Sequence, residues 1–406
     1  MPPRWFIVLA SAFSACSIPS VLASSRNAPP SPSPLAFQPN QYFDGIDGYW
    51  STFTIGIGSP PQYVRTLVSW AGYQTWAVGR AGCHSTDHSQ KCVHARGGLY
   101  NDGNSKTAQY LGVHELGIEK NLGYQGNVEF TYDKVGLGGP GQEGPTLDHV
   151  VVGELVQNDF WLGIFGVNPQ PTNFTGGSDG TPSIITLLAQ EGYIPSVSFA
   201  YTAGASYKDH APFASLTLGG YDSSLVEENG VVFPFATVIP GGIIVGIRDI
   251  TTPSGSGSSS DTTSLLPSGI WAYMDATVAE IWLPQSACEM FESTFGLTYD
   301  DATDLYLVSQ TLHSKLKQRN PSITFTLATN LDQGETVSIK LPYNAFDLMA
   351  SAPYQGLSEA SYYFPLRRAM NNTQYTIGRT FFQEGEYHHG FYAESQLACC
   401  EIASIS

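Results

Sequence analysis

Two polar residues, Ser69 and Asp275, stand at the same position in two copies of one sequence frame. In each copy two apolar or aromatic residues precede the polar residue, and a tryptophan follows it after seven positions. An aspartate can serve as a general acid or a general base. A serine hydroxyl needs a neighbouring base such as histidine to act as a nucleophile, and no histidine lies on either segment. The frame therefore offers one acid–base group and one hydroxyl.

The frame belongs to a longer internal repeat. The segment 160–163 (Phe-Trp-Leu-Gly) follows Ser69 at a distance similar to that at which 376–378 (Thr-Ile-Gly) follows Asp275. A repeat of this kind decides the architecture. Two copies of about 180 residues predict two similar lobes rather than a many-bladed array. We expect an N-terminal lobe at 41–225 and a C-terminal lobe at 226–406.

The composition indicates a protein of strands and turns. The chain of 406 residues has 13% charged residues, 42 glycines and 26 prolines. This balance favours many short strands over long helices, so we expect an all-β fold. The formal net charge is −17, from 35 acidic and 18 basic residues. An acidic protein does not suit the phosphate backbone, which excludes nucleic acid as a partner.

The N-terminus has the features of a secretory signal peptide at 1–23. Arg4 supplies a positive charge, an apolar run follows, and small residues precede Ser24. Residues 24–40 are rich in proline and serine and predict a flexible linker, so folded structure should begin near Tyr42. No later stretch reaches the ~18 apolar residues of a membrane span. We expect a secreted, extracellular monomer, and leave association with a cell wall open.

Five cysteines remain after the signal peptide, and secretion makes disulfides the default. Cys83 and Cys92 are close in sequence and are expected to close a small loop. Cys288 is expected to pair with Cys400 or with Cys399. One thiol is left over, and the sequence does not place it.

The histidines near the first pair, His84, His88 and His94, raise a zinc site as an alternative. Oxidised cysteines cannot ligate a metal, so we favour the disulfide and expect no metal and no cofactor. Asn173 and Asn371 each begin an Asn-x-Thr sequon and are predicted glycosylation sites.

Apolar alternation predicts a first hairpin with strands at 50–57 and 63–68. Helical periodicity predicts short helices, and further alternation predicts more strands. The predicted helices are 182–190, 286–294 and 301–317, and the other strands are 128–137, 150–155, 214–218, 323–327 and 375–377.

Taken together, several segments resemble those of the pepsin-like aspartic peptidases, especially the fungal secreted members. Their number, order and spacing carry the resemblance, which covers the chain from about Tyr42 to its end. The segments are 54–62 (TIGIGSPPQ), 132–135 (YDKV), 162–166 (LGIFG), 218–224 (LGGYDSS), 323–325 (ITF) and 377–381 (IGRTF). The resemblance implies a bilobal all-β fold with a cleft between the lobes.

The resemblance also implies a mechanism. In that family each lobe donates an Asp-Thr/Ser-Gly-Thr/Ser loop, and the two aspartates share one proton and hold one water. One carboxylate takes a proton from the water while the other hydrogen-bonds the scissile carbonyl. The hydroxyl at the second position bonds across to the other lobe, and the hydroxyl at the fourth supports its own carboxylate.

This chain departs from that pattern in both loops. The first loop, 69–72 (Ser-Trp-Ala-Gly), has lost the aspartate and both hydroxyls, and the second, 275–278 (Asp-Ala-Thr-Val), keeps Asp275 alone. One carboxylate cannot be acid and base in the same step, and each role contributes about 10²–10⁴-fold. We therefore expect weak or no peptidase activity. Ser69→Asp alone should not restore it, because the orienting hydroxyls are also missing.

Two readings of Asp275 stay open: a buried aspartate that bonds backbone amides of its own turn, and a residual catalytic group. Trp70 is expected to face the interface of the lobes and to fill part of the space for substrate and water. The family closes a hairpin, the flap, over its substrate, usually with a tyrosine. Tyr124 is the candidate here, and a surface aromatic is the equal alternative.

Three functions follow from these readings. The preferred one is a secreted pepsin-like protein without catalysis that binds a peptide or a protein in its cleft. The alternative is an aspartic endopeptidase that hydrolyses proteins at acid pH with Asp275 as its surviving residue. The third is a purely structural glycoprotein.

Overall fold

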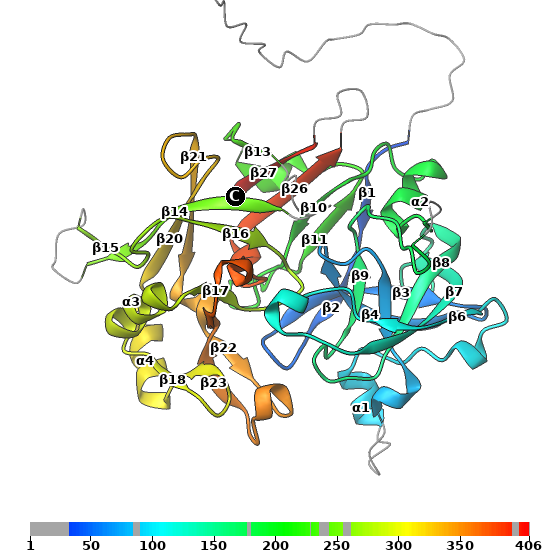
Figure 1. The fold of residues 1–406 in the computed structure, drawn as a ribbon, viewed down its shortest axis with the longest axis horizontal. Helices are drawn as coiled ribbons and strands as arrows, with labels where there is room; N and C mark the ends of the chain where they lie inside the picture. The colour runs from blue at the N-terminus through cyan, green and yellow to red at the C-terminus, as the bar shows by residue number, and fades with distance from the viewer. Residues whose placement is uncertain are drawn as a thin grey trace, which may run out of the picture. The chain divides into compact units, whose positions relative to one another are not determined.

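The computed structural model describes residues 32–83, 90–176, 180–227, 229–234, 243–254, 261–391 and 398–405. The predicted signal peptide and the first part of the predicted linker lie outside these residues. The chain from Pro32 onward forms one compact unit. Most of its elements are strands, as the composition predicts (Figure 1).

The N-terminal lobe is built on an eight-stranded sheet, which contains the predicted first hairpin. Its strands, in spatial order, are β2 (Pro39–Asp44), β3 (Trp50–Ile57), β4 (Gln62–Ser69), β9 (Gly163–Gly166), β5 (Thr75–Val78), β8 (Thr146–Leu155), β7 (Asn127–Leu137) and β6 (Gln109–Glu115). β3 is buried along nearly its whole length, since β2, β4 and β7 all pair with it.

The C-terminal lobe has a matching eight-stranded sheet and a smaller one of four strands. The larger runs β21 (Thr336–Pro342), β20 (Ser322–Ala328), β14 (Ile244–Pro253), β16 (Ile270–Met274), β25 (Thr376–Ile377), β17 (Ile281–Pro284) and β24 (Leu366–Ala369), with β15 (Thr262–Ser264) on β14. The smaller runs β18 (Thr298–Asp300), β19 (Leu305–Leu307), β23 (Ser361–Phe364) and β22 (Leu348–Ala350).

A fourth sheet takes strands from both halves of the chain, and Figure 1 shows its strands together beside both lobes. Its order is β1 (Leu35–Phe37), β11 (Ser215–Leu218), β10 (Ser198–Thr202), β26 (Gly385–Phe391), β27 (Ala398–Ile405) and β12 (Val226–Glu227), with β13 (Val232–Pro234) on β27. The prediction that folded structure begins near Tyr42 is wrong. β1 already pairs with β11, because Phe37 is buried against Phe53, with ring centroids 5.2 Å apart.

The described residues form four α-helices: α1 (Gln90–Ala95), α2 (Ile184–Gln190), α3 (Gln285–Phe295) and α4 (Gln310–Arg319). Short 3-10 turns lie at Arg80–Cys83, Asp102–Asn104, Lys120–Leu122 (η3), Ser223–Leu225, Tyr343–Phe346, Tyr354–Gly356, Asn372–Gln374 (η7) and Phe381–Gln383. The helices predicted at 182–190 and 286–294 are confirmed. The one predicted at 301–317 is wrong at its start, which forms β19. Among the described residues, no helix is long and apolar enough to cross a membrane.

The internal repeat is visible in the strand pairing. In the N-terminal lobe β4 runs parallel to β9, and β5 pairs antiparallel with β9 and parallel with β8. In the C-terminal lobe β16 runs parallel to β25, and β17 pairs antiparallel with β25 and parallel with β24. Trp76 and Trp282, the last residues of the two frames, each make the antiparallel pair. The predicted repeat is thus a repeat of backbone architecture.

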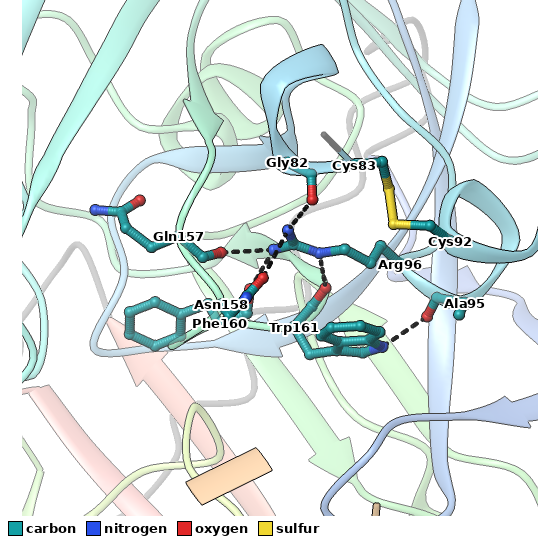
Figure 2. Close-up of a disulfide and its surroundings, with 9 residues drawn as sticks. All are labelled: Gly82, Cys83, Cys92, Ala95, Arg96, Gln157, Asn158, Phe160 and Trp161. Atoms are coloured by element: carbon teal, nitrogen blue, oxygen red, sulfur yellow. Dashed lines mark hydrogen bonds between the residues drawn. A yellow bond between two sulfur atoms is a disulfide. The ribbon is translucent and has the colours of Figure 1, made fainter. Parts of the chain in front are cut away.

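Cys83 and Cys92 form the predicted disulfide, with their Cα atoms 5.9 Å apart (Figure 2). Both sulfurs are therefore committed to each other, which removes the thiolates that a zinc site here would need. His84 and His88 lie outside the described residues. Among the described residues no cluster of three or more histidine, cysteine or acidic side chains could hold a metal.

Beside this disulfide, Arg96 clamps the chain that leads into β9. Its guanidinium is buried and donates only to backbone carbonyls and one side-chain amide oxygen (Figure 2). The acceptors are the carbonyls of Gly82, Gln157, Phe160 and Trp161 and the amide oxygen of Asn158. Burial lowers the pKa of Arg96 to about 10, so it stays charged at neutral and acid pH. The clamp fixes the entry to β9, the strand that supports the first loop.

The predicted bond from Cys288 to Cys400 or Cys399 is wrong. Cys288 is a buried free thiol on α3, 3.4 Å from the carbonyl oxygen of Arg367. α3 packs on β17 and β24 of the C-terminal lobe, whereas β27, which carries Cys399 and Cys400, belongs to the shared sheet. Burial raises the pKa of the Cys288 thiol to about 12.

Candidate functional site

The two polar residues of the repeated frame meet between the lobes through a third residue, Thr277. The Ser69 Oγ lies 2.6 Å from the Thr277 Oγ1, and that hydroxyl donates to the Asp275 Oδ1 over 2.7 Å. Ser69 is fully buried and Asp275 is 4% exposed. The two positions that the repeat makes equivalent in the sequence therefore lie close together between the lobes.

The hydrogen bonds around Ser69 run in one direction. Thr277 gives its single proton to the Asp275 carboxylate, so Ser69 must donate to Thr277. The Ser69 oxygen in turn accepts from the Gly72 amide over 2.8 Å. The resulting series, from the Gly72 amide through two hydroxyls to a carboxylate, links the first loop to the second. The Ser69 proton is thereby committed to Thr277 and not to a base.

The expectation that the orienting hydroxyls are missing needs a correction. Thr277, at the third position of its loop, supplies one hydroxyl that reaches both loops, and its amide also donates to Asp275 Oδ1 at 3.0 Å. The reading of Asp275 as an aspartate that bonds an amide of its own turn therefore describes one of its two oxygens. The guanidinium of Arg379 holds this loop by donating to the backbone carbonyls of Ala276 and Thr277.

Trp70 faces the interface of the lobes, as expected, and its ring is buried. Its Nε1 donates to the Met274 carbonyl at 2.6 Å, so an indole makes the bond between lobes in place of a hydroxyl. Its ring packs against Phe199, Tyr201 and Phe382 of the shared sheet and its margin, and it is 2% exposed. Trp70 also lines a cavity between the loops and the segment 117–121.

The residue that reaches the Asp275 carboxyl is Glu119, which the sequence analysis missed. It lies in the segment 116–126 between β6 and β7, which we call the flap. Its φ of 56° places it in the left-handed region, which is uncommon for a glutamate and concentrates at functional positions. Its side chain is 9% exposed and lies within hydrogen-bonding reach of Asp275.

The pairing of two carboxyls changes the chemistry of Glu119. Burial first, then the negative charge of Asp275 and a hydrogen bond to it, raise the pKa of Glu119 well above its usual range. Two buried carboxylates in contact cannot both ionise at low cost, so the pair retains a proton to higher pH than a lone glutamate. The other oxygen of Asp275, Oδ2, is buried and has no hydrogen-bond donor among the described residues unless Glu119 is protonated.

The tip of the flap is fastened to the C-terminal lobe. The side-chain amide of Asn121 donates to the backbone carbonyl of Thr373 at 2.7 Å. The side-chain amide of Gln374 donates to the backbone carbonyl of Asn121, also at 2.7 Å. Leu122 packs with Val278, Trp282 and Ala369 of the second loop and its strands. In Figure 1 the cyan flap extends from the N-terminal lobe toward β17. The flap therefore bridges the lobes.

Tyr124 lies on the flap, but its ring does not border the cavity that holds Asp275. It packs on Phe160, with ring centroids 5.0 Å apart, and beside Leu122 and Trp282. It lines a small cavity of about 40 Å³ on the other side, near Glu280. Burial, followed by the charge of Glu280, raises the pKa of Tyr124. The alternative of a plain surface aromatic does not fit a ring that packs against both lobes.

A cavity of about 390 Å³ opens beside the carboxyl pair, which is within the usual range for small-ligand sites. It lies between the first loop, the second loop, the flap and η7. Its walls include Trp70, Ile118, Asn168, Ile243, Tyr273 and Thr376, with Glu119 and Asp275 among the polar groups. The two predicted sequon asparagines, Asn173 and Asn371, are exposed, and Asn371 lies just before η7 at the edge of this cavity.

Comparison with solved structures shows the fold. In all, 381 chains of known structure match this one. The crystal structure of the aspartic proteinase from Irpex lacteus matches with a TM-score of 0.57 and 18% sequence identity, over 92% of this chain and 98% of that chain. No family model matches the sequence, and no curated protein matches it. The predicted bilobal, all-β, pepsin-like fold is confirmed, and at this identity the likeness extends to the fold alone.

Proposed function

We propose that this chain is a secreted pepsin-fold protein without peptidase activity that binds a peptide or a protein segment in the cavity beside Asp275. The observation that carries the proposal is the state of Ser69. Its hydroxyl stands in the repeated frame where the other lobe has a carboxylate, and it is hydrogen-bonded to Thr277 and to the Gly72 amide. A hydroxyl whose proton is donated to Thr277 does not share a proton with Asp275 as a second carboxyl would, and it does not act as a base toward water.

The flap supports the same proposal. Glu119 of the flap lies against Asp275, so a protein side chain occupies the flap side of this carboxyl. A peptide bond could approach Asp275 from that side only if the flap moved away. Loss of one member of a cooperative catalytic unit usually removes most of what the unit gives. Binding needs no such unit, and the cavity beside the pair offers apolar walls with a few polar groups.

Secretion is part of the proposal and rests on the sequence of 1–23. The Cys83–Cys92 disulfide supports it, because such bonds persist in oxidising compartments. Mass spectrometry of the protein from the culture medium of a producing host tests it. We expect a mature N-terminus near Ser24 and hexose-containing masses at Asn173 and Asn371. A chain retained in the cytoplasm with Met1 in place would contradict secretion.

Casein hydrolysis between pH 3 and 5 tests the absence of catalysis. We expect no turnover above that of the Asp275→Ala variant. Binding is tested in parallel by screening capped peptides against the protein with isothermal titration calorimetry. Turnover that is lost in Asp275→Ala and kept in Ser69→Ala would overturn the proposal.

A second candidate, an acid endopeptidase, is favoured by one observation. Glu119 gives Asp275 a carboxyl partner, and two carboxyls that share a proton are a known arrangement for acid–base hydrolysis. In this candidate the flap supplies the second carboxyl in place of the first loop. Glu119→Gln would then abolish casein cleavage as completely as Asp275→Asn, whereas Glu129→Gln, an exposed carboxyl on β7, would leave it unchanged.

A further inference from the structure

The pair formed by Glu119 and Asp275 lacks a counter-ion. In the described part of the chain no salt bridge reaches either residue. Lys120, the nearest lysine in sequence, turns away and bonds Glu115 at 2.7 Å. Arg379 gives its guanidinium to backbone carbonyls and, at 3.0 Å, to Asp47. At least one negative charge therefore remains buried without a cation whenever the pair is ionised.

The pair also has a buried acceptor without a donor, and both of its residues border a cavity. Asp275 Oδ2 is buried, and no donor reaches it among the described residues except a protonated Glu119. Both residues line the cavity of about 390 Å³. A buried polar atom is normally hydrogen-bonded, and an exception requires an explanation. A ligand donor that enters through the cavity would supply the missing partner.

Resting on the proposed function, we propose that Glu119 and Asp275 bind one positive group between them: a proton in the empty site, and the primary ammonium of a peptide ligand in the occupied site. An ammonium carries three donors and no acceptor, which suits two carboxylates without donors. The exchange balances, because the incoming ammonium displaces the shared proton, which passes to solvent. No bond of the ligand is broken.

The walls of the cavity and the charge of the protein fit a cationic group. The aromatic residue Tyr273 lines the cavity, and aromatic faces attract ammonium ions. The formal net charge of −17 attracts cations at longer range. Norleucine, which has the same straight stem as lysine but no charge, would meet the same walls and leave both carboxylates unpaired.

The groups that face the pair set its pH dependence. The flap contributes Lys120, which is bonded to Glu115, β16 contributes the phenol of Tyr273, and the first loop contributes no ionisable side chain at 69–72. Because the pKa of Glu119 is raised, ligand and proton compete, and affinity should rise with pH through that pKa. A lysine side chain keeps its charge to about pH 10, whereas an α-amine loses it near pH 8.

Isothermal titration calorimetry of the full mature chain tests the proposal with four probes. They are n-butylammonium, a pentapeptide of alanines with a free amino terminus, the same peptide acetylated with a central lysine, and the acetylated peptide with norleucine in its place. Titrations at pH 5, 7 and 9 in buffers of different ionisation enthalpy measure the protons released. Thermal unfolding of each variant confirms that it is folded.

We expect at least one ammonium probe to bind about ten-fold or more tightly than the norleucine peptide, in line with a charge-assisted hydrogen bond. Binding should release a proton at pH 5 to 7. Glu119→Gln and Asp275→Asn should each reduce the preference, while Glu129→Gln keeps it. A preference that persists at pH 9 assigns the lysine side chain, and one that fades assigns the α-amine.

Each other outcome has a definite meaning. If lysine and norleucine peptides bind equally, the ammonium site is wrong while ligand binding in the cavity stands. If n-butylammonium binds and no peptide does, the carboxyl site stands and the proposed function fails. If Glu119→Gln binds ammonium as well as the wild type, or if no probe binds, the ammonium site is overturned.

Discussion

The two loops of the repeat share a backbone but use their first polar residue differently. In the first loop Ser69 has its proton committed, since it donates to Thr277 and accepts from the Gly72 amide. In the second loop Asp275 satisfies Oδ1 within its own turn, whereas its buried Oδ2 has no donor among the described residues. The comparison teaches that one scaffold can hold a hydrogen-bonded hydroxyl on one side and a carboxyl with an unpaired oxygen on the other.

The largest effect is expected from the residue that follows Ser69. Trp70 is buried among three aromatic rings and bonds across the lobes, whereas its counterpart Ala276 fills little space. Trp70→Ala should lower the free energy of unfolding by about 3–5 kcal/mol through the cavity it leaves. Trp70→Phe, which keeps a ring and loses the N–H, should lower it by about 1–2 kcal/mol. Urea unfolding measures both, and equal losses would mean that packing contributes nothing beyond the hydrogen bond.

Restoring the lost carboxylate should be costly and should not restore catalysis. Ser69→Asp adds a third carboxyl near Asp275 and Glu119, so the pKa of the new aspartate should be raised. The substitution should not lower the free energy of unfolding while the carboxyls are protonated. The loss should grow as the pH rises, to about 2–4 kcal/mol at pH 7. Ser69→Asn has similar shape without charge and should show no such pH dependence. Thermal unfolding from pH 3 to 8 measures the difference, and casein cleavage by Ser69→Asp would contradict the expectation.

Thr277 is the link between the two loops, so its removal should uncouple them. Thr277→Val leaves Ser69 without its acceptor and Asp275 Oδ1 without one donor, and it should cost about 1–3 kcal/mol. Thr277→Ser keeps the hydroxyl and should cost less. Thr380→Val, which removes a buried hydroxyl bonded to one carbonyl, is the matched control, with about 1 kcal/mol expected. If Thr277→Val lowers the free energy of unfolding no more than Thr380→Val does, the link between the loops contributes nothing to stability.

The smallest expected difference concerns the tryptophans that end the two frames. Trp76 donates to Gln74 at 3.1 Å, whereas the buried Nε1 of Trp282 has no partner among the described residues. Trp76→Phe leaves a buried amide oxygen unsatisfied, and Trp282→Phe removes an unsatisfied donor. We expect Trp76→Phe to be the more destabilising by about 1 kcal/mol. Denaturant midpoints of the two variants, compared at equal slopes, provide the measurement.

The sequence predicts the fold because the two lobes carry the same sequence frame and the same strand pairing. The repeated frame and the alternating segments depend on local periodicity, and the strand pairing around Trp76 and Trp282 repeats accordingly. The beginning of the folded unit was predicted too late, because proline-rich composition outweighed the single buried residue Phe37. The predicted pairing of Cys288 is wrong because the sequence does not show that α3 packs on β17 and β24, whereas β27 belongs to the shared sheet.

The site was harder to predict than the fold, for a physical reason. Ser69 and Asp275 stand at equivalent positions of a repeat, so their proximity could be expected. Glu119 has no counterpart in the frame, and nothing local distinguishes it from other acidic surface residues. Its role depends on a left-handed backbone and on the docking of the flap against η7, which are tertiary facts. The role of Thr277 was not predicted because the family motif has its hydroxyls at the second and fourth positions of the loop. Thr277 stands at the third position, yet its hydroxyl reaches both loops.

The bridge made by the flap has a consequence for the direction in which a ligand can lie. The roomy cavity beside Asp275 and the small one beside Tyr124 share no lining residue, and the flap borders both. An extended chain that enters the roomy side meets Glu119 of the flap, and the small cavity does not continue its path. We therefore expect the site to read chain ends and protruding side chains, like a socket, rather than to accommodate the middle of a strand, like a channel.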